Sequence, residues 1–279
     1  MRFGSRLREA MDTRGPLCVG IDPHPALMDA WGLTDSAFGL EKFAMTAVEA
    51  FAGVVAVVKP QSAFFERHGS AGIAVLEKVV TACRESGALV LLDVKRGDIG
   101  STAQAYADAY LTSSSPLAVE AITVSPYLGM GSLDPVIDTA LRHDRGVFVL
   151  AMTSNPEGPQ FQHARTADGR TVAGTVLDAV AARNVDAEGL GSVGAVVGAT
   201  IGGPVDAELL DVNGPLLVPG IGAQGGTPDD VRRIFGSAVR NVLPSISRDI
   251  LGAGPGKQAL HEAALAAVER FSGLADPQS

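Results

Sequence analysis

The sequence is poor in cysteine, in aromatic residues and in positive charge. Its 279 residues include two cysteines, Cys18 and Cys83, and aromatic side chains make up 5% of the chain. Two cysteines are too few for a disulfide framework or a metal cluster, so we interpret both as buried free thiols. The formal net charge is -9, whereas a broad nucleic-acid surface needs clustered lysine and arginine. We therefore expect no nucleic-acid partner, although one or two cations could still hold a small anion.

Long apolar runs are also missing. No run reaches the roughly 18 residues that a membrane span requires. The first residues, MRFGSRLREAMDTRG, lack the continuous apolar region and the cleavage site of a secretory signal. We therefore expect a cytoplasmic protein with no membrane partner. Hydrophobic residues nevertheless make up 46% of the chain and charged residues 19%, which is enough apolar material for a sizeable core.

Eight short apolar segments recur along the chain. Each is nearly continuous in apolar character, as expected of parallel strands that are covered on both faces. The predicted strands are LCVGID (17–22), VVAVVK (54–59), LVLLDVK (89–95), AITVS (121–125), VFVLAM (147–152), VGAVVGA (193–199), LLVPGIG (216–222) and VRNVLPS (239–245).

Helical patterns separate these strands, with apolar residues at i, i+3 and i+4. The clearest lie at 40–52, 71–87, 171–189 and 228–236. Alternating strands and helices over about 250 residues fit a closed barrel better than an open sheet, which usually stops at about six strands. We therefore predict an α/β fold, a single-domain (β/α)8 TIM barrel spanning 1–279 with its core at about 17–272.

Charged residues stand at the carboxyl ends of the first three predicted strands. Because side chains alternate along a strand, Asp93 and Lys95 share a face with Leu91, which we place toward the barrel mouth. The same alternation turns Lys59 and Asp22 inward from the two preceding strands. One ion pair could simply close a barrel, but desolvating several charges together is costly unless function requires them. The sequence therefore predicts an active site at this mouth.

Asp98 lies beyond the third strand, close to the start of the next predicted helix. Ser101 and Thr102 supply hydroxyls that could cap this helix, and a carboxylate suits the positive end of a helix dipole. The spacing leaves both a structural and a functional role open for Asp98.

A second candidate site follows the last two predicted strands. PGIGAQGGTPDDVRRIF (219–235) brings glycines after the seventh strand, and Arg248 follows the eighth at the start of a predicted short helix. Barrel enzymes often hold phosphate at this position, where a guanidinium can bind it bidentately. A dinucleotide site is disfavoured, because the glycine motif does not open the first βαβ unit. No histidine has metal-ligand spacing with another histidine or cysteine, so we predict no metal.

Together these residues resemble the orotidine 5'-phosphate decarboxylase family, specifically its longer bacterial subgroup. The resemblance covers residues 17 to 252 and implies a lyase that converts orotidine 5'-phosphate to UMP in pyrimidine biosynthesis, without any cofactor. It rests on the motif Asp93-x-Lys95-x-x-Asp98-Ile99-x-x-Thr102, on Lys59 before it, and on PGIGAQGG and Arg248 after it.

The resemblance implies four catalytic residues, Lys95, Asp93, Asp98 and Lys59. They would form a charged array around the reacting carboxylate, and Lys95 would donate the proton to C6. Asp98 and Thr102 would reach into the site of the neighbouring subunit, so the resemblance also implies a homodimer.

The same resemblance implies the substrate contacts. Asp22 would bind ribose hydroxyls together with the neighbour's threonine, and Ile99 would line an apolar pocket beside the carboxylate. Ser154 would contact the pyrimidine amide, while Gln224 and Arg248 would hold the 5'-phosphate.

Three other functions stay open. A sugar-phosphate lyase of the same superfamily shares the Asp-x-Lys-x-x-Asp pattern but binds magnesium, and those relatives carry an acidic ligand where this chain has Lys59. Schiff-base aldolase chemistry at Lys59 or Lys95 would need a neutral lysine, whereas the neighbouring Asp93 favours the protonated form. A non-catalytic barrel would bind the nucleotide without turnover.

Overall fold

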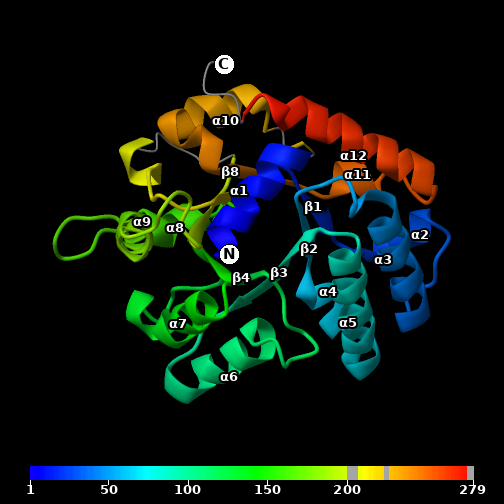
Figure 1. The fold of residues 1–279 in the computed structure, drawn as a ribbon, viewed down its shortest axis with the longest axis horizontal. Coiled ribbons are helices and arrows are strands. Elements are labelled where there is room, and N and C mark those ends of the chain that lie inside the picture. Colours follow the sequence, from blue (N-terminus) through cyan, green and yellow to red (C-terminus); the bar gives the residue numbers. More distant parts are fainter. Residues whose placement is uncertain (200–206, 223–225, 275–279) are drawn as a thin grey trace.

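Eight parallel strands form a closed barrel. The computed structural model describes residues 1–199, 207–222 and 226–274. Each strand pairs with the next in sequence order, and β8 pairs with β1, which confirms the predicted (β/α)8 barrel (Figure 1). The strands are β1 (Cys18–Ile21), β2 (Val57–Pro60), β3 (Leu89–Arg96), β4 (Ala121–Val124), β5 (Gly146–Met152), β6 (Val193–Val197), β7 (Leu216–Val218) and β8 (Val242–Ile246).

Helices surround the barrel, and they include the helical segments that the sequence predicts (Figure 1). The α-helices are α1 (Phe3–Arg14), α2 (Pro25–Ala30), α3 (Ala37–Phe51), α4 (Ser62–Glu66), α5 (Gly69–Glu85), α6 (Gly100–Leu111), α7 (Asp134–Arg142), α8 (Gly158–Gln162), α9 (Val172–Arg183), α10 (Pro228–Phe235), α11 (Arg248–Leu251) and α12 (Lys257–Ser272). Three 3-10 helices complete the set, η1 (Met130–Leu133), η2 (Ala207–Leu210) and η3 (Gly236–Asn241). No helix in the described part of the chain is long and apolar enough to cross a membrane.

The core has two layers. One cluster lies between the strands and the outer helices, and the other fills the barrel interior. Cys18, Val57 and Leu91 belong to the interior cluster, as the alternation of side chains predicts. Cys18 and Cys83 are free, and burial raises the pKa of both thiols to about 12.

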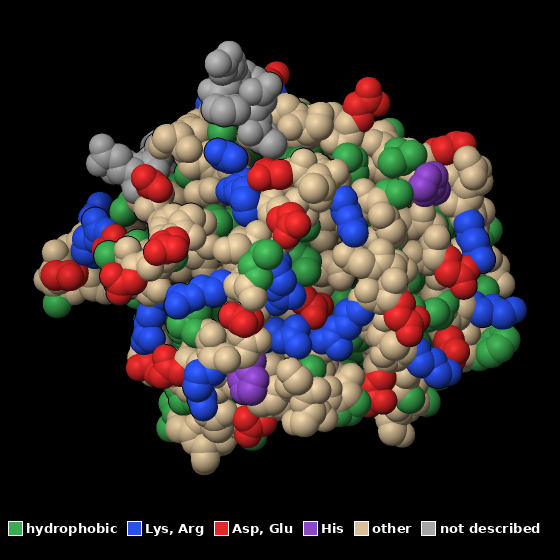
Figure 2. Space-filling view, in the orientation of Figure 1, with side chains coloured by type: hydrophobic (Ala, Val, Ile, Leu, Met, Phe, Trp, Pro, Cys, Tyr) green, Lys and Arg blue, Asp and Glu red, His purple; other side chains and the backbone are tan. Residues whose placement is uncertain are grey.

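Helix α1 covers one end of the barrel, which the sequence analysis does not predict. Phe3, Leu7 and Met11 project from α1 into the interior cluster, and the Phe3 ring meets Phe148 edge to face at 6.2 Å. Figure 1 shows α1 crossing the barrel, with the other helices around it. On the face seen in Figure 2, acidic and basic side chains are interspersed. Within the described part of the chain, α1 covers this end and the interior opens toward the carboxyl ends of the strands.

The structure corrects the start of two predicted strands. β2 begins at Val57 instead of residue 54, although Val55 and Ala56 are both buried. Before β8, the 3-10 helix η3 takes up residues that the prediction placed in the strand. A run of apolar residues indicates that a segment is buried. It does not distinguish a strand from a buried turn, so the predicted strands begin too early.

The connections 61–68, after β2, and 153–171, after β5, contain local structure. Helix α4 occupies part of the segment after β2, and α8 occupies part of the segment after β5. An isolated antiparallel bridge between Arg165 and Thr171 closes the second connection on itself. Both connections therefore present ordered backbone beside the mouth of the barrel.

Candidate active site

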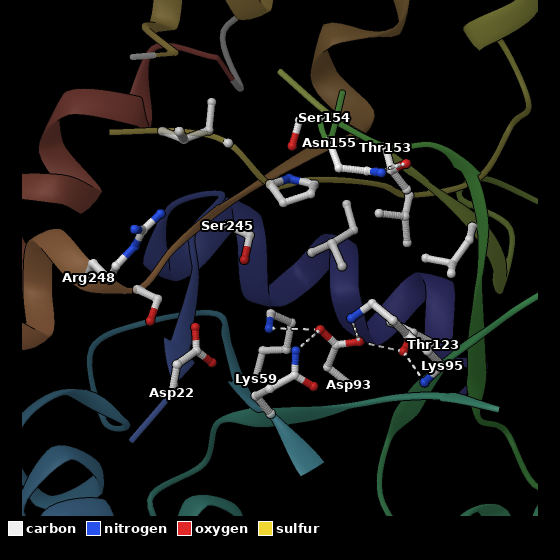
Figure 3. A pocket seen from close by; sticks show the side chains of 18 of the residues that line it. Asp22, Lys59, Asp93, Lys95, Thr123, Thr153, Ser154, Asn155, Ser245 and Arg248 are labelled. Atoms are coloured by element: carbon white, nitrogen blue, oxygen red, sulfur yellow. Dashed lines mark hydrogen bonds and ion pairs between the residues drawn. The ribbon is translucent and has the colours of Figure 1, made fainter. Parts of the chain in front are cut away.

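A pocket of about 360 Å³ opens at the carboxyl ends of the strands (Figure 3). The open end of the barrel therefore coincides with the mouth where the sequence analysis expects the charges to meet. Six of the predicted site residues line this pocket, namely Asp22, Lys59, Asp93, Lys95, Ser154 and Arg248.

Asp93 lies at the centre of the charged end of the pocket. Its Oδ2 accepts hydrogen bonds from Lys59 Nζ at 3.2 Å and from Gln61 Nε2 at 3.0 Å. Its Oδ1 accepts from Lys95 Nζ at 2.6 Å and from Thr123 Oγ1 at 2.7 Å. Donors from β2, β3, β4 and the residue after β2 thus fix both oxygens of one carboxylate (Figure 3).

These contacts keep the charged pair ionised. Burial alone would raise the pKa of Asp93, but attraction to Lys59 and Lys95 and the hydrogen bonds from Lys95 and Thr123 hold that pKa well below its usual range. Burial also opposes the charge of Lys59, yet Asp22 and Asp93 raise the pKa of its ammonium above the usual range. Asp93 and Lys59 are therefore both charged at neutral pH.

Lys95 departs from regular strand geometry. Its φ angle is 46°, in the left-handed region that non-glycine residues rarely adopt. The pairing of β3 with β4 shifts register between Leu92 and Arg96, so Lys95 lies in a bulge. Asp93 and Lys95 therefore both line the pocket, as predicted, but Lys95 reaches it from a bulge and not through the regular alternation of a strand.

The opposite end of the pocket carries Arg248. It is the first residue of α11, as predicted, and Figure 3 shows it across the pocket from Lys95. Nearby, Asp22 Oδ1 and Ser247 Oγ are buried and have no hydrogen-bond partner among the described residues. A Cβ on Gly20 would lie 2.8 Å from the Cβ of Ser247, so glycine makes room for this approach. Buried polar atoms normally have partners, so both atoms are available for a hydrogen bond to a polar group in the pocket.

Trp31 supports α11 from behind. Its Nε1 donates a hydrogen bond to the carbonyl oxygen of Leu251 at 3.0 Å, and its ring stacks on Phe43 with centroids 4.0 Å apart. Trp31 and Phe43 are both buried in the outer core cluster. Because Leu251 is the last residue of α11, this contact fixes the short helix that begins with Arg248.

Polar residues after β5 form the upper wall of the pocket. Ser154 lines it together with Thr153 and Asn155 (Figure 3). Gln162, from α8, accepts from the backbone N–H of Thr153 at 2.9 Å and donates to its Oγ1 at 2.7 Å. These two bonds anchor the segment on which Ser154 is carried.

An apolar wall separates the charged end from the polar rim. Leu150 of β5, Val196 of β6 and Leu217 of β7 line the pocket, together with Pro219 and Ile221 after β7. This surface suits the face of a flat ring, and it lowers the local dielectric around the charges.

Three predicted site residues lie outside the pocket of their own chain. Asp98 Oδ1 accepts a hydrogen bond from the backbone N–H of Ile99 at 2.8 Å, and the Ile99 side chain is 61% exposed. Thr102 is exposed on the first turn of α6. No side chain caps α6, so the capping role that the sequence leaves open for Ser101 and Thr102 is not seen. A fourth predicted residue, Gln224, lies outside the described part of the chain.

Sequence reasoning misses several polar residues that line the pocket, among them Gln61, Thr123 and Ser245. Gln61 follows Lys59 by two positions, and Thr123 and Ser245 follow interior residues of their strands in the same way. The rule that places Asp93 therefore also finds these residues, but uncharged side chains give a weaker signal. Within the described residues, no three histidine, cysteine, aspartate or glutamate side chains gather as a metal site.

Comparison with known proteins decides the family. The model of the Orotidine 5'-phosphate decarboxylase / HUMPS family matches residues 15–263. The chain belongs to this family. An orotidine 5'-phosphate decarboxylase from Salinispora tropica is 61% identical over 262 residues, which are 94% of this chain and 94% of that relative. A relative of the same name from a Nocardioides species is 65% identical over 252 residues, 89% of this chain and 91% of its own length.

Solved structures agree with the family. A crystal structure assigned as orotidine 5'-phosphate decarboxylase from Streptomyces avermitilis matches with a TM-score of 0.94 at 57% identity, covering 98% of this chain and 96% of the other. The Leishmania donovani OMP decarboxylase matches with a TM-score of 0.79 at 32% identity, covering 99% of both chains. Both of these structures share this barrel over nearly their whole length.

Proposed function

We propose that this chain removes carbon dioxide from orotidine 5'-phosphate and releases UMP, without a cofactor. The carrying observation is the Asp93 carboxylate at the barrel mouth, which contacts the ammonium groups of Lys59 at 3.2 Å and Lys95 at 2.6 Å. Relatives at 61% and 65% identity are orotidine 5'-phosphate decarboxylases. The activity is that of a carboxy-lyase of pyrimidine biosynthesis.

The reaction breaks the bond between C6 of the pyrimidine and its carboxylate. The electron pair of that bond stays on C6 while the carboxylate leaves as neutral carbon dioxide. Lys95 gives a proton from its ammonium to C6, and the resulting amine regains a proton from solvent. The Lys95 side chain is 47% exposed in the unliganded chain, so solvent can reprotonate it between turnovers.

Charge placement supports this chemistry. Asp93 holds the ammonium of Lys95 where negative charge develops at C6, and the attraction between that ammonium and C6 is stronger in the transition state than in the bound substrate. Asp93 would also repel a substrate carboxylate about 4 Å away by about 4 kcal/mol at an effective dielectric of about 20. The departure of neutral carbon dioxide removes that repulsion.

The remaining pocket residues bind the nucleotide in this proposal. Arg248 and Gln224 hold the 5'-phosphate, and the unpartnered oxygen of Asp22 accepts a ribose hydroxyl. Ser154 contacts the pyrimidine amide from the wall opposite Asp93 (Figure 3). Phosphate binding far from C6 supplies energy for closing and drying the site.

The proposal includes a homodimer of single-domain chains in the cytoplasm. Asp98, Ile99 and Thr102 lie outside their own pocket, and the 61% exposure of Ile99 is high for a large apolar side chain. Pairing of two copies would bury Ile99 and deliver Asp98 and Thr102 to the neighbouring site. The decarboxylase array would then contain its fourth charged member.

The decisive experiment follows orotidine 5'-phosphate by ultraviolet absorbance with metal-stripped protein. We expect conversion to UMP that excess chelator does not slow. Lys95→Ala should abolish turnover, whereas Lys78→Ala, which removes a surface lysine paired with Glu41, should retain it. Full activity of Lys95→Ala would overturn the role of Lys95, and nucleotide binding without turnover by the wild type would favour a binding barrel.

Two observations disfavour the other enzyme classes. Lys59 occupies the place of an acidic magnesium ligand, and its ammonium would repel a divalent cation beside Asp93. The raised pKa of Lys59 also works against Schiff-base chemistry, which needs the neutral amine. Chelator sensitivity would support the magnesium-dependent lyase, and borohydride trapping of a carbonyl substrate would support the aldolase.

A further inference from the structure

The β3 bulge leaves the backbone of Lys95 without a regular partner in the sheet. Parallel pairing connects Leu92 to Ile122 and resumes only at Arg96 and Val124. Between these pairs, the Lys95 N–H donates to the hydroxyl Oγ1 of Thr123 at 3.0 Å. A side chain of β4 thus replaces the carbonyl that the strand ladder would otherwise supply.

Thr123 also contacts the Asp93 carboxylate, to which the Lys95 ammonium is hydrogen-bonded. Its hydroxyl donates to Asp93 Oδ1 at 2.7 Å, and the same oxygen accepts from Lys95 Nζ at 2.6 Å. A hydroxyl has one proton to donate. The Thr123 hydroxyl accepts from the Lys95 backbone N–H and donates to Asp93, and these two bonds together fix its orientation. Three hydrogen bonds therefore form a closed ring through the backbone of Lys95, the side chain of Thr123, the carboxylate of Asp93 and the ammonium of Lys95 (Figure 3).

The surroundings make this ring rigid. Thr123 is 1% exposed, and a β-branched residue on a strand has restricted χ1 freedom. Lys95, by contrast, has a positive φ of 46° and a side chain that is 47% exposed, so neither its backbone preference nor burial fixes it. Among the described residues, Thr123 is the side chain that bonds to both the backbone of Lys95 and the carboxylate of Asp93.

We propose that Thr123 is a positioning residue of the decarboxylation, which holds the Lys95 backbone in its left-handed conformation and aims the ammonium of Lys95 beside Asp93. The inference rests on the proposed function, because it takes Lys95 as the proton donor. Without the hydroxyl, the Lys95 N–H loses its acceptor and the left-handed conformation loses its support. Lys95 then moves out of line with C6 while the nucleotide contacts at the other end of the pocket are unchanged.

The test compares Thr123→Val, which removes the hydroxyl at nearly constant shape, with Thr123→Ser, which retains it. We expect Thr123→Val to lower kcat by about 100-fold with KM nearly unchanged, because small misplacement of a reacting group costs about that factor. Thr123→Ser should stay within about fivefold of the wild type, because it keeps the donor and the acceptor. Thr139→Val is the matched control, since Thr139 is equally buried and hydrogen-bonded but lies on α7.

A second measurement needs no turnover. Hydrogen exchange of the Lys95 amide, followed by NMR or mass spectrometry, should be faster in Thr123→Val than in the wild type and in Thr139→Val. If wild-type protein fails to convert orotidine 5'-phosphate, the proposed function fails, and the exchange rate still tests the backbone contact. If wild-type protein is active and Thr123→Val keeps its kcat, or if the Lys95 amide exchanges at the wild-type rate, the role of Thr123 is overturned.

Discussion

The ammonium of Lys59 lies 3.2 Å from Oδ2 of Asp93, and each of these side chains is 9% exposed. Charges this deeply buried depend on each other, because removing one partner leaves the other desolvated and only partly compensated. The pair lies on two neighbouring strands, so its geometry is set by the barrel and not by a loop.

Substitution of Lys59 should therefore affect both stability and catalysis. We expect Lys59→Met to lower the unfolding free energy by about 3 kcal/mol, at the low end for a broken buried pair, because Lys95 still faces Asp93. Urea unfolding measures this change, and kcat should fall in parallel. Lys78→Met serves as the surface control, and equal stability of the two variants would contradict the prediction.

The depressed pKa of Asp93 predicts how stability depends on acid. Because that pKa is lower in the folded chain than in the unfolded chain, Asp93 contributes its full stability above about pH 4 and loses it as pH falls further. Asp93→Asn should therefore show a shallower loss of unfolding free energy between about pH 5 and pH 2 than the wild type. The exposed control Asp211→Asn should follow the wild-type curve, and an unchanged acid slope in Asp93→Asn would refute this assignment.

Arg248 should act on substrate affinity. Loss of hydrogen bonds to a charged phosphate costs about 3 kcal/mol, so we expect Arg248→Ala to raise KM by about 100-fold. Arg248→Lys should recover part of the loss, since a lysine keeps the charge but not the bidentate fork. Steady-state kinetics with the surface control Arg233→Ala checks the effect. A change in kcat alone would argue against phosphate binding by Arg248.

Mixing inactive subunits tests whether two chains share a site. Neither Lys95→Ala nor Asp98→Ala alone should turn over at an appreciable rate. An equal mixture of re-assorted chains should regain about one quarter of wild-type activity, because about half of the dimers are heterodimers and each heterodimer has one intact site of two. A mixture as inactive as its components would show that Asp98 does not act across an interface.

Substitution of Glu120 should change the stability of the chain but not its catalysis. Its carboxylate is buried and accepts from Arg84, Arg145 and the backbone N–H of Val90. Removing it leaves Arg145, whose side chain is 13% exposed, without its anion. We expect Glu120→Ala to lower the unfolding free energy by about 3 kcal/mol while KM stays unchanged. Thermal unfolding and kinetics on the same samples check both halves.

The sequence predicts the barrel and the charged end of the pocket, because both depend on local patterns. Apolar runs locate the strands, and strand parity turns Asp93 and Lys59 inward. The bulge at Lys95 is not predictable in this way, since it depends on the pairing of β3 with β4. The contact between Trp31 and the carbonyl oxygen of Leu251 is not predictable either. It joins segments that are distant in the sequence, so no local pattern indicates it.

The covering role of α1 is missed for a related reason. Its apolar residues show one buried face but do not say which surface receives it. The roles of Asp98 and Thr102 raise the same difficulty between chains, because the surface they would meet belongs to a second copy. Patterns along one chain indicate which residues are buried. The surface against which they pack can be identified only from the three-dimensional structure or from relatives.

Helix α1 also bears on the order in which the chain folds. It precedes all eight strands in the chain, yet the backbone N–H of Gly4 bonds to Ser192 and the guanidinium of Arg8 bonds to the carbonyl oxygen of Arg240. A nascent α1 therefore has no docking surface until most of the polypeptide has left the ribosome, and its apolar face stays accessible to chaperones throughout translation. Closure of the barrel floor becomes a late event that waits for the last strand.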